Sequence, residues 1–332
     1  MISARVTSSP QLWFACLLGA CLLAFSACAS GCRAEPQKNA TQAAGQPPAA
    51  ASVPADAAPP PEAAGGFDGR RAYEHVARLV AVGPRSPGSE GIRRAQEYIR
   101  AQLQGFGCRV EEDDFHASTP IGSVAMKNIV AKIPGASPNV VLLTTHYDTK
   151  RLENFVGAND GGSSTGLMLE LARLLCSRKN ALTVWIAFFD GEEAIVEWSP
   201  TDGTYGSRQM AAKLAVSGEL RRVKAMLLAD LIGDRNLKIK RESNSTHWLT
   251  DLVWSTAARL GYRGIFVSEE MPIEDDHIPF LRRNVPAVDV IDLNAPYWHT
   301  PGDTLDKVSA RSLAIVGHVF LESLAALEKK FR

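Results

Sequence analysis

The sequence predicts an α/β fold: a single globular domain with a central mixed, mostly parallel, twisted β-sheet that helices cover on both faces. Short apolar runs that suit buried strands alternate with helical segments through most of the chain. The run 182–189 is largely apolar and rich in β-branched and aromatic residues, which is typical of a strand buried on both faces. Several such runs end in polar clusters, and strand ends are where open α/β sheets place their ligands.

The first half of the domain begins with two helices separated by a break rich in glycine and proline. Apolar residues between 73 and 80 recur with a helical period, and Ser89 followed by Glu90 opens the second helix. We expect Pro134 and Pro138 to bracket a turn into a third strand. The expected elements are helices over 70–82 and 89–106, strands over 108–115, 127–133 and 139–145, and a helix over 163–175.

The second half opens with the apolar strand at 182–189 and continues the alternation. A long loop after this strand precedes a short helix that begins after residue 206. The remaining expected elements are strands over 225–230, 265–267 and 286–291 and helices over 247–260 and 309–328. Because strands and helices alternate along the chain, most strands are expected to run parallel.

The N-terminal residues 1–32 are expected to be a signal peptide. Residues 11–25 are almost entirely apolar, Arg5 precedes them and small residues follow, a layout that is typical of a secretory signal. Ordinary cleavage beside Cys28 and lipoprotein-type processing at Cys28 or Cys32 both fit the sequence. We therefore expect an exported bacterial protein that is either periplasmic or an outer-membrane-anchored lipoprotein, touching the membrane only through an N-terminal lipid.

Residues 33–66 and 67–332 are expected to be a disordered tether and the catalytic domain. The tether is rich in alanine, proline, glutamine and glycine and has almost no large apolar side chain to bury. The chain has 36 basic and 36 acidic residues, so nothing in its charge suggests a nucleic-acid partner. Four of the six cysteines lie in the signal region, and the other two, Cys108 and Cys176, are either joined in a disulfide or buried as free thiols. We expect a monomer.

A pair of adjacent carboxylates, Glu192 and Glu193, directly follows the strand at 182–189. Two neighbouring carboxylates raise each other's pKa because their negative charges repel, and a bound cation would remove that repulsion. A solvated acidic turn is the alternative interpretation of the pair alone. Other strand ends and the loops beyond them carry further acidic residues and histidines: His146, Asp148, Asp160, Asp230, Asp275 and His299. Carboxylates and imidazoles without thiolates suit a catalytic zinc ion.

The order of motifs resembles the zinc aminopeptidase (M28-like) superfamily, and within it the glutaminyl-peptide cyclotransferase branch. The shared motifs are His-x-Asp at 146–148, Gly-Ala-Asn-Asp at 157–160, Phe-Asp-Gly-Glu-Glu at 189–193, Leu-x-Asp-Leu-Ile-Gly at 228–233 and Trp-His at 298–299. The resemblance covers about residues 70–332. The loop from Trp198 to Arg208, the run 274–283 and Trp298 directly before His299 favour the cyclotransferase branch.

The resemblance implies a role for each candidate residue. It implies one zinc per chain, held by Asp160, Glu193 and His299. Glu192 would carry protons, with Asp230 and Asp275 as its carboxylate partners, so that these three form the catalytic group. The substrate-binding candidates are Trp198, Trp298, Ile273 and Glu274. The implied reaction converts the N-terminal glutamine of a peptide or protein into pyroglutamate with release of ammonia.

Two other functions stay open at this stage. A zinc aminopeptidase would use two zinc ions, with His146 and Asp230 at the second metal, Asp160 bridging the two and Glu192 activating water. His146 and Asp148 would then either bind the second metal or support its ligands. A non-catalytic exported binding domain on the same fold is the third interpretation. Gly161 after Asp160 argues against the peptidase. The segment 292–297 argues against the cyclotransferase, because it lacks a phenylalanine expected at the rim of that enzyme's pocket.

Overall fold

The computed structural model describes residues 57–332, and the predicted signal peptide and most of the predicted tether lie outside them. The helices are η1 (Pro61–Ala64), α1 (Gly69–Val82), α2 (Glu90–Gly105), α3 (Gly162–Cys176), α4 (Tyr205–Ser217), η2 (Glu219–Arg222), α5 (His247–Arg259), α6 (Ile278–Leu281), η3 (Leu305–Lys307) and α7 (Ala310–Phe331). The strands are β1 (Arg109–Thr119), β2 (Gly122–Ile133), β3 (Gly135–His146), β4 (Asn180–Phe189), β5 (Val223–Asp230), β6 (Ile239–Glu242), β7 (Phe266–Met271) and β8 (Ala287–Ile291).

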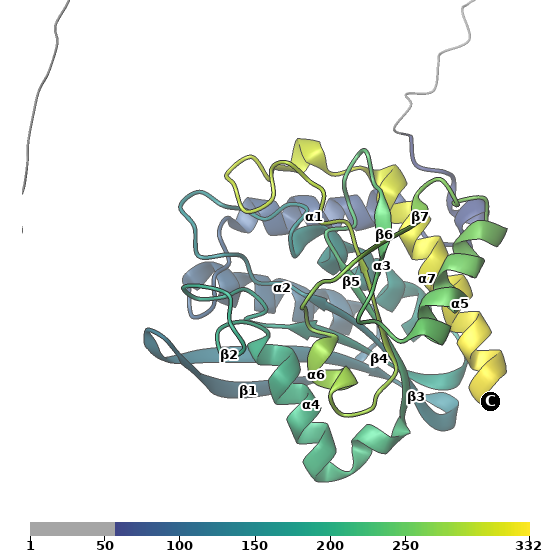
Figure 1. Ribbon diagram of the computed structural model, residues 1–332, viewed down its shortest axis with the longest axis horizontal. Coiled ribbons are helices and arrows are strands. Elements are labelled where there is room, and N and C mark those ends of the chain that lie inside the picture. The colour runs from purple at the N-terminus through teal and green to yellow at the C-terminus, as the bar shows by residue number, and fades with distance from the viewer. Residues whose placement is uncertain (1–56) are drawn as a thin grey trace, which may run out of the picture. The chain divides into compact units, whose positions relative to one another are not determined.

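A six-stranded mixed sheet forms the centre of this domain, with the strand order β1-β2-β4-β3-β5-β8 (Figure 1). The pairs β4–β3, β3–β5 and β5–β8 are parallel, whereas β1–β2 and β2–β4 are antiparallel. A separate parallel pair joins β6 to β7. Four neighbouring strands thus run the same way, so their carboxyl ends lie at one edge of the sheet. The predicted fold class is confirmed.

Helices cover both faces of the sheet, and the alternation along β4 shows how. Val184, Ile186 and Phe188 pack into the larger core cluster with α1, α2, α3, α5 and α7. Trp185 and Phe189 point the other way, into a second cluster with α4 and α6. In Figure 1, α4 and α6 lie in front of the sheet and α1, α2 and α3 behind it. Because β4 is buried on both faces, it reads as an uninterrupted apolar run, as predicted.

Several details of the predicted elements are wrong: β6 was not predicted, and β1 and β2 are longer than expected. The chain from 135 to 138 is part of β3 and not a turn; the register of β3 shifts between Ser137 and Val140, and such a bulge accommodates Pro138 inside a strand. The end of the predicted tether also differs, because Pro61–Ala64 form η1 and Ala64 is fully buried. A single buried alanine does not stand out from the alanine-rich sequence around it.

Two features bind the elements to one another. A disulfide joins Cys108 to Cys176, with 5.4 Å between the Cα atoms, and so fixes the start of β1 to the end of α3. The long helix α7 is apolar enough to cross a membrane, but 67% of its most apolar window is buried inside the domain. We therefore assign α7 as a core helix.

Candidate active site

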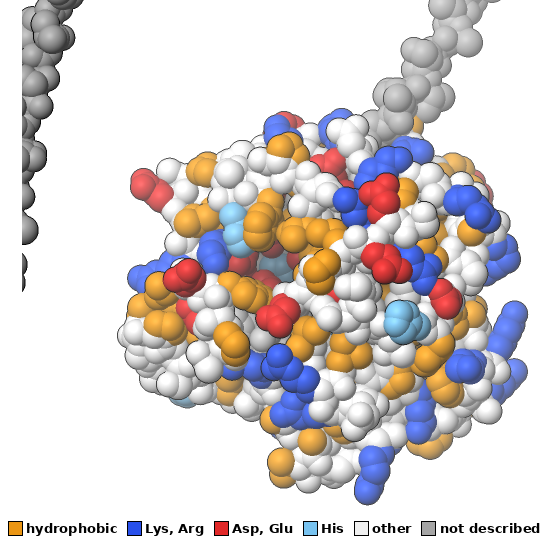
Figure 2. Space-filling view, in the orientation of Figure 1, with side chains coloured by type: hydrophobic (Ala, Val, Ile, Leu, Met, Phe, Trp, Pro, Cys, Tyr) orange, Lys and Arg blue, Asp and Glu red, His pale blue; other side chains and the backbone are white. Residues whose placement is uncertain are grey.

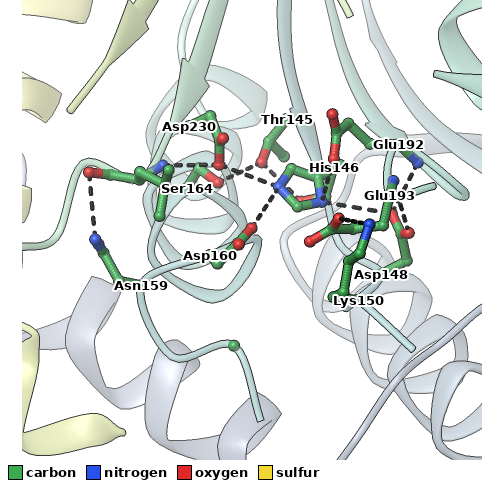
Figure 3. A network of polar contacts seen from close by, with 12 residues as sticks. Thr145, His146, Asp148, Lys150, Asn159, Asp160, Ser164, Glu192, Glu193 and Asp230 are labelled. Atoms are coloured by element: carbon green, nitrogen blue, oxygen red, sulfur yellow. Dashed lines mark hydrogen bonds and ion pairs between the residues drawn. The ribbon is translucent and has the colours of Figure 1, made fainter. Parts of the chain in front are cut away.

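The site lies where the parallel strands end. His146 is the last residue of β3, Asp230 is the last residue of β5, and Glu192 and Glu193 follow β4. These strands are hydrogen-bonded neighbours, so residues far apart in sequence meet at one edge of the sheet. Figure 3 shows the resulting network of carboxylates around the imidazole of His146.

Asp148 fixes the turn that carries the glutamate pair. Its Oδ1 accepts a hydrogen bond from the amide of Glu192 at 3.1 Å, and its Oδ2 accepts one from the amide of Glu193 at 3.2 Å. Asp148 is fully buried. Both carboxylate oxygens are therefore used on the backbone, which places Asp148 as a support for the pair and leaves the side chains of Glu192 and Glu193 free to face the site (Figure 3).

Asp160, Glu193 and His299 bring three ligand atoms together. His299 Nε2 lies 3.1 Å from Glu193 Oε1 and 3.4 Å from Asp160 Oδ2. Asp160 Oδ2 is buried and has no hydrogen-bond partner within the described part of the chain. Atoms at these separations can all lie about 2.0–2.2 Å from one central zinc ion. Three protein ligands with an open fourth position suit a catalytic metal, and the residues therefore fit zinc.

A second group shares Asp160 with the first. The ligand atoms of His146, Asp160 and Asp230 also lie within 4.8 Å of one another. His146 Nε2 is 3.0 Å from Asp230 Oδ1 and 3.3 Å from Asp160 Oδ1. Burial alone would lower the pKa of His146, but the charge of Asp230 raises it well above the ordinary value. A histidine carrying a proton would itself link the two carboxylates, so the geometry of this group does not require a second metal.

Asp160 does not serve as the N-cap of α3, although it lies just before that helix and aspartate is a common cap residue. The N-cap of α3 is Gly161, whose φ of 69° is favourable for glycine. A Cβ atom there would lie 2.7 Å from the carbonyl of Asp148 and 3.0 Å from the His146 ring. The glycine thus allows the loop to lie close to the site, and the Asp160 carboxylate points toward the ring of His146 (Figure 3).

Glu192 stands beside a buried group of further carboxylates. Burial, with Asp275 and Glu193 nearby, raises the pKa of Glu192 well above its ordinary value. Burial and the charge of Asp230 raise the pKa of Asp275 to about 6. Burial also raises the pKa of Asp230. A glutamate with a raised pKa next to carboxyls that share protons can both accept and return a proton near neutral pH.

A pocket of about 380 Å³ opens over these residues. Its lining includes the acidic residues and His299 together with an apolar wall: Trp198, Pro272, Ile273, Ile291, Leu293 and Trp298. Trp198 and Trp298 are 39% and 41% exposed, so both rings are available to a ligand. The ring of Trp298 stacks on His299 with the centroids 4.0 Å apart. Figure 2 shows this hollow, with acidic and histidine side chains inside a hydrophobic rim.

The Trp198 loop is held by Asp202. The carboxylate of Asp202 accepts hydrogen bonds from the amides of Ile195, Val196 and Glu197, and from the hydroxyl of Tyr205. These four donors lower the pKa of Asp202 although burial opposes them. The loop is therefore ordered by its own aspartate, and Trp198 stands at a fixed position on the rim.

All predicted site residues converge on this edge of the sheet. Asp148 lies 3.4 Å from His146 Nδ1 through its Oδ1, in addition to binding the two backbone amides. The sequence analysis missed several residues that shape the site. One is Lys150, whose Nζ lies 3.7 Å from Glu193 Oε2. The others are Arg85, Asp276, Asp289, Leu293 and Asp303. Asp276 directly follows Asp275, and Asp303 comes four residues after His299. Their closeness in sequence to candidate residues could have identified these two aspartates. Their burial, which makes them important for the site, could not be predicted from the sequence.

Comparison with known proteins places the chain in a family. The model of peptidase family M28 matches residues 128–324, and the chain belongs to that family. A zinc-dependent exopeptidase of known structure from Parabacteroides distasonis has a TM-score of 0.71 and 27% identity, covering 78% of this chain and 98% of that one.

Within the family the chain belongs with the glutaminyl-peptide cyclotransferases. The cyclotransferase of Bothrops jararaca is 35% identical over 281 residues, which cover 71% of this chain and 76% of the relative. The crystal structure of a glutaminyl cyclase from an Acidobacteriales bacterium has a TM-score of 0.77 and 40% identity, covering 85% of this chain and all of that one. The resemblance found in the sequence is confirmed.

Proposed function

We propose that the protein is a glutaminyl-peptide cyclotransferase, an acyltransferase that acts on peptides or proteins with an N-terminal glutamine. The amine nitrogen at the N-terminus attacks the side-chain amide carbon, a five-membered lactam forms, and the carbon–nitrogen bond to the side-chain nitrogen breaks with release of ammonia. The observation that carries the proposal is the pocket between Trp198 and Trp298, which opens on Glu192 and on the Asp160–Glu193–His299 group.

Zinc is the proposed cofactor, and Asp160, Glu193 and His299 would hold it. When bound, the ion would polarise the side-chain amide and stabilise the negative charge that develops on its oxygen. Lys150 Nζ lies 3.7 Å from Glu193 Oε2, so the lysine restrains the carboxylate oxygen that does not face His299. Because cyclisation is intramolecular and requires no activated water, one metal ion per chain is sufficient.

Glu192 is the proposed proton carrier. Its carboxylate takes a proton from the attacking amine and gives a proton to the leaving nitrogen, so that ammonia departs neutral. General acid–base help of this kind is typically worth roughly 10²- to 10⁴-fold in rate. Asp230 and Asp275 keep a proton between them and thereby limit the negative charge around Glu192, because burial and their mutual repulsion raise the pKa of Asp275.

Substrate binding is proposed to depend on the aromatic and apolar rim. Trp198 and Trp298 would pack against the glutamine side chain and the next residue, with Ile273 and Glu274 forming the facing wall. Leu293 occupies the rim at the segment where the sequence lacks a phenylalanine. Export through residues 1–32, with a lipid anchor or without one, and the monomeric state remain predictions.

The deciding experiment uses aminoacyl fluorophores that carry glutamine or leucine. We expect the glutamine compound to yield the lactam and ammonia, with the pyroglutamyl product identified by mass spectrometry. Release of the fluorophore from the leucine compound without any lactam product would overturn the proposal. A Glu192→Gln preparation made in the same host is the control, because a contaminating peptidase would survive in it.

A zinc aminopeptidase is the second candidate, and a specific observation supports it. The His146–Asp160–Asp230 group shares Asp160 with the first group, as a site for two bridged metal ions would. Counting metal ions by native mass spectrometry separates the two functions. Two zinc ions per chain together with leucine release would favour the peptidase, and one zinc ion per chain favours cyclisation.

A further inference from the structure

The loop that carries Asp160 belongs to no helix or strand, yet it must hold a metal ligand in place. It runs from Val156 to Asp160, between β3 and α3. Asp303 Oδ1 accepts a hydrogen bond from the amide of Asn159 at 2.8 Å, and Oδ2 accepts one from the amide of Asp160 at 3.0 Å. The side chain is fully buried. Both oxygens of one carboxylate are therefore committed to the backbone of the candidate ligand and its neighbour.

Asp303 also lies on the loop that carries His299. The carbonyl of Asp303 accepts from the amide of Ala158 at 3.3 Å, and the amide of Asp303 donates to the carbonyl of Thr300 at 3.1 Å. His299 itself has a φ of 51°, a left-handed conformation that costs a histidine energy and requires support from its surroundings. One residue thus connects the backbone of the Asp160 loop to that of the His299 loop.

Arg85 holds the same loop from the carbonyl side. Its guanidinium donates to the carbonyls of Val156 at 2.6 Å, Gly157 at 3.0 Å and Tyr147 at 3.1 Å. The side chain is fully buried. A Cβ atom at Gly157 would lie 2.5 Å from the carbonyl of Asp160, so the loop is also tightly folded on itself. Its amides are bound by a carboxylate and its carbonyls by a guanidinium, and these opposite charges compensate each other within the core.

We propose that Asp303 is a positioning residue that sets the distance between the metal ligands Asp160 and His299, with Arg85 as its counterpart on the other side of the loop. The proposal rests on the proposed function only in taking Asp160 and His299 as ligands of one metal ion. Neither Asp303 nor Arg85 lines the pocket, so both act through the ligands and not on the substrate. Supports of this kind typically contribute roughly 10- to 100-fold to metal affinity.

The test is the zinc affinity of Asp303→Asn, measured on the full chain by competition with a chromophoric chelator. Asparagine keeps the size of the side chain and one accepting oxygen but presents an NH₂ group to the second amide. We expect zinc affinity to fall roughly 10- to 100-fold. We also expect a shifted cobalt absorption band in the cobalt-loaded protein, since a changed ligand geometry alters that spectrum. The matched control is Asp306→Asn, an exposed aspartate three residues away that contacts Lys307 and Thr304.

A purely structural role would lower the melting temperature of the metal-free protein and leave both the zinc affinity and the cobalt spectrum unchanged; that result would overturn the proposal. If Asp303→Asn does not fold, Arg85→Lys decides, since lysine keeps the charge but cannot span three carbonyls. We expect a smaller, several-fold loss of zinc affinity there, and wild-type affinity would again contradict the proposal. A wild-type chain that binds no zinc would instead overturn the proposed function, so the two failures are distinguishable.

Discussion

Two groups of buried carboxylates lie near each other in this site, and their negative charge is neutralised in different ways. Asp160 and Glu193 converge with the imidazole of His299, and their ligand atoms approach within 4.8 Å of one another beside an open pocket. Asp276 and Asp289 lie deeper, and none of their carboxylate oxygens has a hydrogen-bond partner in the described structure. The first geometry suits a metal ion. The second suits protonated carboxyls, because burial raises the pKa of both residues well above the ordinary value.

The comparison teaches that residue type alone does not identify a metal site. Both groups consist of buried acids, and both have an imidazole nearby, since His277 Nδ1 lies 3.8 Å from Asp289 Oδ2. Only the first group combines converging ligand atoms with access from solvent. Glu192 lies between them: it neighbours the metal group in sequence, yet its charge interacts with Asp275 and Asp276 as well. This position is consistent with the proposed roles, in which Glu192 would exchange protons and Glu193 would bind the metal.

The largest effect should come from substituting the two adjacent glutamates one at a time. Glu193→Ala should lose zinc and therefore all activity, because one of three protein ligands is removed. Glu192→Gln should keep zinc at wild-type stoichiometry but lose roughly 10²- to 10⁴-fold in kcat, since proton transfer is removed. Metal analysis and steady-state kinetics on both variants measure this. Equal loss of zinc in the two would mean that the division of roles between the pair is wrong.

Removal of the metal should affect stability as well as activity. Dialysis against a chelator should abolish cyclisation, and one equivalent of zinc should restore it. Zinc at about 1,000 times its Kd should stabilise the fold by about 4 kcal/mol, because the ion binds only the folded chain. Calorimetry of the two forms measures the shift in Tm. An unchanged Tm and full activity after complete zinc removal would contradict the assignment of the first group as a metal site.

Truncation of the aromatic rim should weaken substrate binding without touching either acidic group. Trp198→Ala is expected to raise KM by about 10-fold, in line with the 1–3 kcal/mol typical of losing a buried aromatic contact in a pocket. Zinc content should stay at one ion per chain. Trp254→Phe is the matched control, because that tryptophan packs in the core against Phe266 away from the pocket. A Trp198→Ala enzyme with unchanged KM would remove Trp198 from the substrate wall.

The smallest effect is expected from Asp289→Asn, which tests the difference between the two groups of buried carboxylates most directly. The folded state holds a proton on this carboxyl over a pH range where the unfolded chain has released it, because the folded pKa is raised. Stability of the wild type therefore falls as pH rises above the unfolded value near 3.8. Asparagine carries no charge to bury, so the variant should gain in Tm relative to wild type as pH increases from 5 upward, with zinc affinity unchanged.

Thermal melts of the metal-free proteins between about pH 5 and 8 measure the Asp289→Asn difference. A loss of zinc in this variant would place Asp289 in the metal group and break the distinction between the two clusters. The corresponding substitution in the first group, Asp160→Asn, should instead lower zinc affinity at every pH, and so serves as the contrasting control.

Much of the fold was predictable because its signals are local. The buried run of β4, the serine N-cap of α2 and the strand-end positions of Glu192 and Asp230 all follow from short stretches of sequence. The resemblance to a known family then assigned residues to one site. Pro138 misled the prediction of β3, because a bulge that tolerates proline depends on the neighbouring strands.

The sequence did not reveal the buried charged residues that hold the loops of the site in place. Asp303, Arg85 and Glu242 bind backbone groups of segments distant in sequence. Glu242, for example, accepts a hydrogen bond from the amide of Ile273, 31 residues further along the chain. Any backbone amide or carbonyl can serve as the partner, so no particular residue type marks such a contact. Only the folded chain reveals which buried charge holds which loop.

The strand order has a consequence for how the protein matures. Asp160 and Glu193 follow strands in the centre of the sheet, whereas His299 follows β8, which pairs with β5 only after some sixty intervening residues have been placed: Met226 aligns with Ala287. β8 is also the last strand of the sheet in chain order, so the sheet cannot be complete before β8 has been synthesised. The third ligand therefore reaches its partners only when the last strand has joined the sheet. Metal acquisition should accordingly mark the end of folding, and a nascent or truncated chain cannot retain the ion with the full ligand set.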